Sequence, residues 1–247
     1  MAADATARLA VRRKGRVAVL TLERPGFGNR LSEQMADEVT AALESARKDP
    51  EIGACVLTGH GEVFCLGGDY RGAGPTSAGR TGYAQALIGM DRAMAELGKP
   101  LVAAVNGDAH AGGFGLVIAS DLAVVAGDAT LGLPEAANGL FPFIALAIVK
   151  DALPKKLLFD LIYNARLMSA QEAREVHVVN QVVPRADVLD RAIELAERAS
   201  RHDAQIVRLG RDLYYRLRGA GPDDALAESR AALLAALAET DRAPDAN

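Results

Sequence analysis

The stretch "VNGDAHAGGFGLVIASD", at residues 105–121, decides the fold of this chain. Four glycines stand before it turns apolar: Gly107, Gly112, Gly113 and Gly115. Glycine adopts positive φ without strain and lets backbone N–H groups approach a ligand closely. The stretch therefore predicts a short helix over 112–119 that begins at glycines.

Short apolar strands alternate with helices around this stretch. The composition predicts strands at 16–25, 54–59, 99–107, 121–127 and 178–184. Helical periodicity marks residues 33–48, which Ser32 caps, and residues 83–97. Residues 61–82 are glycine-rich and are expected to form a surface loop around a short strand. This alternation favours the α/β class.

The second half is more helical. Apolar helices are expected over 143–153 and 155–165, and "SAQE" at 169–172 has the form of a capping box. From residue 187 to 237 the pattern is helical, with breaks near His202 and at 219–224. We place a boundary near residue 190, between a core over 1–190 and a helical part over 191–247.

Composition limits the classes of function. The chain has 247 residues, half of them hydrophobic, and a formal net charge of −4 with no basic block, so a nucleic-acid partner is not expected. No apolar segment has the length of a signal or membrane span, which favours a cytoplasmic protein. Cys55 and Cys65 are expected to be free and buried, with a disulfide as the weaker alternative. No C-x-x-C or paired histidine supports a metal site.

Two glycine-rich stretches each follow a predicted strand. They are "FCLGGD" at 64–69 and "HAGGFG" at 110–115. Two backbone N–H groups, one of them at a helix N-terminus, form an oxyanion hole when both point at developing negative charge. The spacing is equally compatible with two tight turns and close backbone packing.

Five segments occur in the order seen in the crotonase superfamily, the enoyl-CoA hydratase/isomerase family, and the chain resembles that family over about residues 16–185. The segments are "ERPGFGNRLSEQM", "VLTGHGEVFCLGGD", "KPLVAAVNGDAHAGGFGLVIASDLAVVA", "LGLPEAANGLFP" and "MSAQEAREVHVVNQVVP". The resemblance implies a spiral of β-β-α turns with two roughly perpendicular sheets. It also implies a C-terminal helical part that packs in a homotrimer or hexamer, a CoA thioester substrate, and no metal or further cofactor.

The resemblance also implies catalytic roles. The N–H groups of Gly68 and Gly112 would bind the thioester oxygen and stabilise an enolate. Glu135 would be the acid/base, whereas Gly115 stands where two-acid hydratases carry a second Glu. A single carboxylate suffices to move a proton between two carbons, which favours an isomerase. Without the resemblance, Glu135 would be interpreted as a surface or capping carboxylate after Pro134.

Further residues are assigned to substrate binding by the same resemblance. Arg30 lies in the loop that the family uses on the adenine side of CoA. There it would bind a phosphate of CoA or remain a solvated surface charge. Leu66 and Asp69 flank the first hole glycine, and Asp69 is expected to hold its loop. Asn138 and Phe141 belong to the acyl pocket, which "GLFPF" makes bulky and apolar.

Other positions leave alternatives open. Asp108 and His110 precede Gly112, and either would be a replacement for the missing acid, although a packed or solvent-facing histidine is the simpler interpretation. Tyr70 and Tyr83 are also candidates for the pocket. Arg211 falls near a lysine of the family that contacts CoA across a subunit boundary.

Two further functions compete with the isomerase. One is a dehydratase or decarboxylase of the same superfamily that acts on a CoA-bound or acyl-carrier-protein-bound acyl group. The other is a catalytically weak CoA-binding scaffold, since one expected acid is missing.

Overall fold

The computed structural model describes residues 8–240. A six-stranded sheet has the order β1-β2-β3-β5-β7-β10, in which only β1 is antiparallel to its neighbour. Its strands are β1 (Arg8–Lys14), β2 (Val17–Glu23), β3 (Ala54–Gly59), β5 (Leu101–Val105), β7 (Leu122–Ala126) and β10 (Gln181–Val183). All six residues of β3 are buried, as expected of a central parallel strand.

A second sheet has four short strands in the order β4-β6-β8-β9. They are β4 (Val63–Cys65), β6 (Asp108–His110), β8 (Thr130–Gly132) and β9 (Leu167–Ser169). The first three run parallel, and β9 is antiparallel to β8. The two sheets confirm the predicted mixed α/β class.

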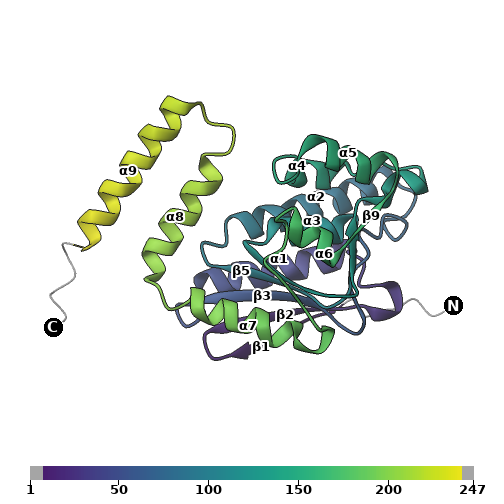
Figure 1. Cartoon of the computed structure of the whole chain (residues 1–247), viewed down its shortest axis with the longest axis horizontal. Coiled ribbons are helices and arrows are strands. Elements are labelled where there is room, and N and C mark those ends of the chain that lie inside the picture. Colours follow the sequence, from purple (N-terminus) through teal and green to yellow (C-terminus); the bar gives the residue numbers. More distant parts are fainter. Residues whose placement is uncertain (1–7, 241–247) are drawn as a thin grey trace.

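The predicted spiral of β-β-α turns is confirmed as well. Each turn adds one strand to the large sheet, one to the small sheet and then a helix (Figure 1). The turns are β3-β4-α2 (α2, Ser77–Ala95), β5-β6-α3 (α3, Gly112–Ala119) and β7-β8 followed by the 3-10 helix η2 (Pro134–Asn138). Equivalent loops of successive turns are therefore neighbours in space.

Helices complete the core. They are α1 (Glu33–Lys48), α4 (Phe143–Val149), α5 (Lys155–Tyr163), α6 (Ala170–Glu175) and α7 (Val188–Ala199). The Ser32 hydroxyl accepts a hydrogen bond from the Met35 amide at 3.2 Å and caps α1, as predicted. The N-cap half of the predicted capping box is confirmed, because Ser169 accepts from the amide of Glu172 at 3.1 Å, whereas the Glu172 carboxylate binds Arg166.

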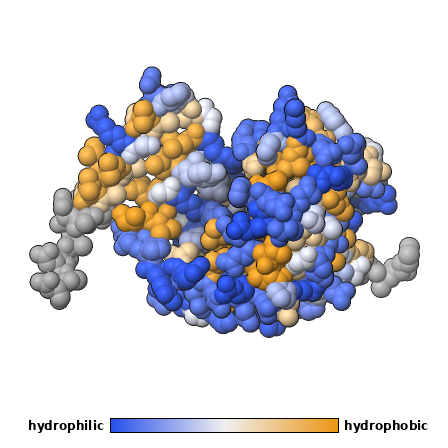
Figure 2. All heavy atoms as spheres, in the orientation of Figure 1, coloured by the Kyte–Doolittle hydropathy of each residue, from blue (hydrophilic) through white to orange (hydrophobic). Residues whose placement is uncertain are grey.

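The last two helices form a hairpin at one side of the core, and the first of them contacts the core through Arg211. Figure 1 shows α8 (Ala204–Arg216) and α9 (Pro222–Thr240) as a hairpin at the left of the molecule. The helix breaks fall near the predicted positions. Apolar side chains gather over this hairpin in Figure 2, and α9 exposes Leu226, Leu233, Leu234 and Leu237.

The structure adds strands that were not predicted, β1 among them, and corrects the predicted start of one helix. Helix α2 begins at Ser77, not at residue 83, so residues 77–82 do not belong to the expected loop. Thr76 caps this helix by accepting from the amide of Gly79 at 3.1 Å. Glycines disfavour a helix, so none was expected here. At Gly79, however, a β-carbon would meet the Ala73 carbonyl, so glycine permits this close packing.

Two other expectations can be compared with the described residues. Cys55 and Cys65 are free and buried, as predicted. Over residues 8–240 no helix has the length and apolarity needed to cross a membrane. Residues 1–7 and 241–247, which belong to the ends of the two predicted parts, lie outside the described residues. The boundary near residue 190 stays a prediction.

Candidate active site

Three loops of the spiral converge at one edge of the small sheet. Gly68 lies three residues after β4, Gly112 two residues after β6, and Glu135 three residues after β8. Since these strands are parallel neighbours, their carboxyl ends lie side by side. The topology therefore brings all three predicted catalytic residues to a single cavity, of about 600 Å³, which they line together.

Two backbone amides are available in this cavity. Gly112 is the first residue of α3, so its N–H has no acceptor within the helix. The strand-like bridge at Gly68 uses the Gly67 carbonyl and the Asp69 amide, which leaves the Gly68 N–H unused. Among the described residues, neither amide has a hydrogen-bond acceptor. Both are therefore free to bind a ligand oxygen.

The backbone before Gly112 is strained. Ala111 has φ 55° and ψ −125°, a conformation that residues with a β-carbon rarely adopt. Its amide donates to the Gly132 carbonyl at 2.8 Å, which anchors the turn to the end of β8. The sharp turn from β6 into α3 orients the start of the helix toward the cavity.

Neighbouring glycines are required by close packing. A β-carbon on Gly67, which has φ 94°, would lie 2.6 Å from the β-carbon of Ala111. One on Gly113 would meet the backbone carbonyl of Cys65. These two glycines therefore hold the loop after β4 against the start of α3. Close packing thus explains Gly67 and Gly113, whereas an oxyanion hole is compatible with the free amides of Gly68 and Gly112.

Glu135 is half-buried in η2 and lines the cavity. Its Oε2 atom is buried and has no hydrogen-bond partner among residues 8–240. Burial raises the pKa of this carboxyl from 4.5 to about 7. A carboxyl with such a pKa exchanges protons readily near neutral pH, which suits a general acid/base.

Gly115 occupies the buried face of α3 that the cavity reaches. A β-carbon there would lie 3.6 Å from the β-carbon of Ala145 and 4.0 Å from Cδ1 of Ile148, both on α4. Helix α4 thus packs over the position of the missing carboxylate.

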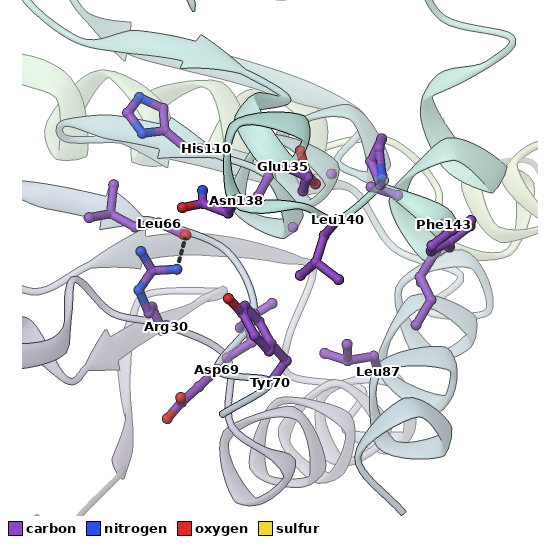
Figure 3. A pocket seen from close by; sticks show the side chains of 18 of the residues that line it. Arg30, Leu66, Asp69, Tyr70, Leu87, His110, Glu135, Asn138, Leu140 and Phe143 are labelled. Atoms are coloured by element: carbon purple, nitrogen blue, oxygen red, sulfur yellow. Dashed lines mark hydrogen bonds between the residues drawn. The ribbon is translucent and has the colours of Figure 1, made fainter. Parts of the chain in front are cut away.

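The rest of the cavity is mostly apolar. Figure 3 shows Glu135 and Asn138 on one side and Tyr70 and Asp69 on the opposite side, with Leu87 and Phe143 farther along. The "GLFPF" segment contributes Leu140, Phe141 and Phe143, and the rings of the two phenylalanines lie 5.7 Å apart. Asn138 and Phe141 therefore line the cavity, as do both tyrosines. The hydroxyl of Tyr83 lies against Gly68.

Arg30, Leu66 and Asp69 also line the cavity, and two of them have internal partners. Arg30 donates from Nη1 to the Leu66 carbonyl at 2.7 Å (Figure 3). The Asp69 carboxylate accepts from Arg24 at 2.9 Å and from the Gly72 amide at 3.2 Å. Asp69 therefore holds its own loop.

His110 lines the cavity but Asp108 does not. The Thr130 hydroxyl donates to Asp108 Oδ1 at 2.8 Å and lies 2.8 Å from His110 Nε2. Since that hydroxyl proton is engaged, His110 donates from Nε2 and keeps Nδ1 as an acceptor. Burial lowers the pKa of His110.

Arg211 lies away from the cavity. Its guanidinium binds Asp121 at 3.0 Å and the carbonyls of Met94 and Ala95 at 2.7 Å each. The side chain is only 7% exposed. These protein partners account for the position of Arg211, so no ligand is needed to hold it there.

Asp91 was not predicted as a site residue, yet it lines the cavity from α2. The signal was available, because Leu87, Met90, Asp91 and Met94 have the spacing of one helix face. A carboxylate on an otherwise apolar face is unusual.

The comparisons with known proteins show the family to which the chain belongs. The model of the enoyl-CoA hydratase/isomerase family matches residues 12–235. The chain belongs to the enoyl-CoA hydratase/isomerase family. Family members act on acyl-CoA thioesters, so this chain is an acyl-CoA-processing enzyme of the crotonase superfamily.

Individual members of the family show the extent of the similarity. Enoyl-CoA hydratase EchA19 of Mycobacterium tuberculosis is 34% identical over 197 residues, which are 77% of this chain and 73% of that protein. Carnitinyl-CoA dehydratase of Salmonella enteritidis is 34% identical over 187 residues, or 75% and 71% of the two chains. The crystal structure of an enoyl-CoA hydratase from Mycobacterium smegmatis superposes with a TM-score of 0.88 at 27% identity, covering 93% and 90% of the chains.

Proposed function

We propose that this enzyme isomerises enoyl-CoA thioesters through an enolate, with Glu135 as its single acid/base. The amides of Gly68 and Gly112 hold the thioester oxygen. Their arrangement supports the proposal because both are free and line the cavity that Glu135 enters. Donors fixed before reaction stabilise developing negative charge at no cost of reorganisation.

The reaction transfers one proton between two carbons. The Glu135 carboxylate removes a proton from C2 of a 3-enoyl thioester, and the electron pair moves onto the thioester oxygen as a dienolate. The neutral carboxyl then returns the proton to C4. The double bond shifts from C3–C4 to C2–C3, and Glu135 is ionised again.

The observation that supports this proposal most strongly is the unpartnered Oε2 atom of Glu135. A buried carboxylate oxygen is costly unless it is hydrogen-bonded. This one lies in the cavity that the two amides line, where a substrate would cover it. A purely structural carboxylate would be expected to have an internal partner, as Asp69 does.

Positive charge suits the CoA part of the substrate. Arg30 and the exposed Arg71 line the same cavity. Guanidinium groups bind phosphates with directed hydrogen bonds. We therefore assign the phosphates of CoA to this side and the acyl chain to the apolar surface made by Leu87, Leu140 and Phe141.

The test is a parallel assay of purified protein with 3-enoyl-CoA and 2-enoyl-CoA. We expect isomerisation of the first, lost in Glu135→Gln and kept in Glu44→Gln, which changes an exposed glutamate on α1. Tight CoA binding without turnover of either thioester would instead favour a scaffold.

A second candidate is hydration or dehydration at the same site, on a CoA-bound or carrier-protein-bound acyl group. His110 favours it, because this residue lines the cavity that already holds Glu135 and its ring is held by the Thr130 hydroxyl. Two related enzymes carry the names hydratase and dehydratase. Hydration of 2-enoyl-CoA that is lost in His110→Gln would select this candidate.

We also propose that copies of the chain associate through α8 and α9, as a trimer or hexamer. The exposed leucines of α9 support this, since such apolar faces commonly mark interfaces. Light scattering on the intact protein tests it, and a monomer at micromolar concentration would contradict it.

A further inference from the structure

Asp91 lies where two hollows of the molecule meet. It lines the active-site cavity and also a second hollow of about 410 Å³ between α2, α3, α4 and α8. Ile148, on α4, also lines both hollows. Asp91 therefore lies at the border between the active-site cavity and the second hollow.

Helix α2 runs along one side of this cavity. Tyr83, Leu87 and Asp91 are spaced by four residues, so they share one face of the helix, and all three line the cavity. The Tyr83 hydroxyl lies against Gly68, the proposed site of the thioester oxygen. Asp91 follows two turns later, about 12 Å along the helix axis.

The Asp91 carboxyl has no partner among the described residues. Its pKa is raised from 3.8 to about 7, and burial is the sole cause, without a hydrogen bond or a nearby charge. In the active-site cavity the neighbouring lining residues Leu87, Met90 and Ile148 are apolar, whereas the second hollow is also lined by tyrosine side chains of α8 and by arginine side chains. A carboxyl in such surroundings gains stability from any polar group that reaches it.

We propose that Asp91 recognises a hydroxyl group on the acyl chain of the substrate, at a carbon remote from the thioester. This inference rests on the proposed function, because it places the thioester at Gly68 and Gly112. A carboxyl group accepts a hydrogen bond from a hydroxyl and, when neutral, also donates one. An unsubstituted chain reaching Asp91 leaves the carboxyl without a partner. The residue therefore sets the specificity of the acyl pocket and takes no part in proton transfer at C2 or C4.

Binding of saturated CoA thioesters tests the inference without requiring turnover. Calorimetry would compare ω-hydroxyhexanoyl-, ω-hydroxyoctanoyl- and ω-hydroxydecanoyl-CoA with the unsubstituted thioester of the same length. For at least one length, we expect the hydroxylated thioester to bind about three- to tenfold more tightly. Asp91→Leu should reverse this preference, and Asp91→Asn should keep part of it, because an amide still donates and accepts.

Asp151→Asn is the matched control. Asp151 lines the second hollow but not the active-site cavity, and its carboxylate is exposed and paired with Lys150 at 2.7 Å. This variant should keep the wild-type preference. Thioesters that bind with no preference for a hydroxyl at any length, or a preference that persists in Asp91→Leu, would overturn the assignment alone. Failure of every CoA thioester to bind would overturn the proposed function as well.

Discussion

Gly112 lies beside Gly68, although the two residues belong to different turns of the spiral. A β-carbon placed on Gly112 would be 3.6 Å from the amide nitrogen of Gly68 and 3.6 Å from Cδ1 of Leu31. It would therefore fit without a clash, yet it would occupy the space between the two donors. Stability and activity can be separated at this position.

We expect Gly112→Ala to fold normally and to lose activity. Alanine favours a helix over glycine by about 0.5–1 kcal/mol, so stability should not fall. The methyl group crowds the thioester oxygen, and loss of one oxyanion donor lowers turnover by about 100- to 1000-fold. Gly89→Ala is the control, since this helical glycine does not line the cavity and has free space around it. Equal activity of the two variants would argue against an oxyanion hole here.

Activity should depend on the ionisation of Glu135. Its pKa is raised to about 7 by burial, and the proposed reaction begins with the carboxylate. Because only the ionised form accepts the C2 proton, kcat/KM should fall about tenfold per pH unit below pH 7 and level off above it. Initial rates with 3-enoyl-CoA between pH 5 and 9 test this. A profile without any fall on the acidic side would contradict the assignment.

Glu135→Gln should stabilise the protein at alkaline pH. A folded-state pKa of about 7 exceeds the ordinary 4.5, so the native state holds its proton more tightly than the unfolded state. Stability is therefore lost as pH rises through this interval, and the loss is complete above it. Glutamine removes the loss, which gives a gain of about 1–2 kcal/mol at pH 8 and almost none at pH 4. Urea unfolding at both pH values measures this, and a gain at pH 4 equal to that at pH 8 would show another origin.

Gly67→Ala should destabilise the chain strongly. The residue has φ 94°, and its β-carbon would lie 2.6 Å from that of Ala111. We expect a loss of about 2–4 kcal/mol, part of which Ala111→Gly in the same chain should restore by removing the contact. Gly89→Ala on α2 has free space around it and should gain about 0.5–1 kcal/mol. Denaturant unfolding of the four proteins tests the packing; a neutral Gly67→Ala would refute it.

The sequence predicted most of the long elements and the order of the turns, because apolar runs such as 54–59 and 101–105 are strong local signals. It did not predict β1, in which charged residues outnumber apolar ones. It missed the three-residue strands β6, β8 and β9, which depend on pairing with each other rather than on their own composition. Of these, β6 pairs in parallel with β4, and β8 pairs in parallel with β6, which brings Gly68, Gly112 and Glu135 together. The resemblance placed these residues in one site. The sequence marks Asp91 as a carboxylate on an apolar helix face, but only the structure shows that this face lines the cavity. The Thr130 link between Asp108 and His110 was equally hidden, because it joins separate turns.

The isomerisation proposed for this site requires a thioester enolate, formed by proton transfer to Glu135. Hydrogen exchange at C2 of butyryl-CoA in deuterated water, followed by NMR, tests it directly, because it needs neither a double bond nor a known substrate. We expect steady deuteration at C2 by the wild-type protein and a loss of about 100- to 10,000-fold in Glu135→Gln, with binding of the thioester retained. Bound butyryl-CoA that keeps its C2 protons in the wild type, or equal exchange in both proteins, would contradict it.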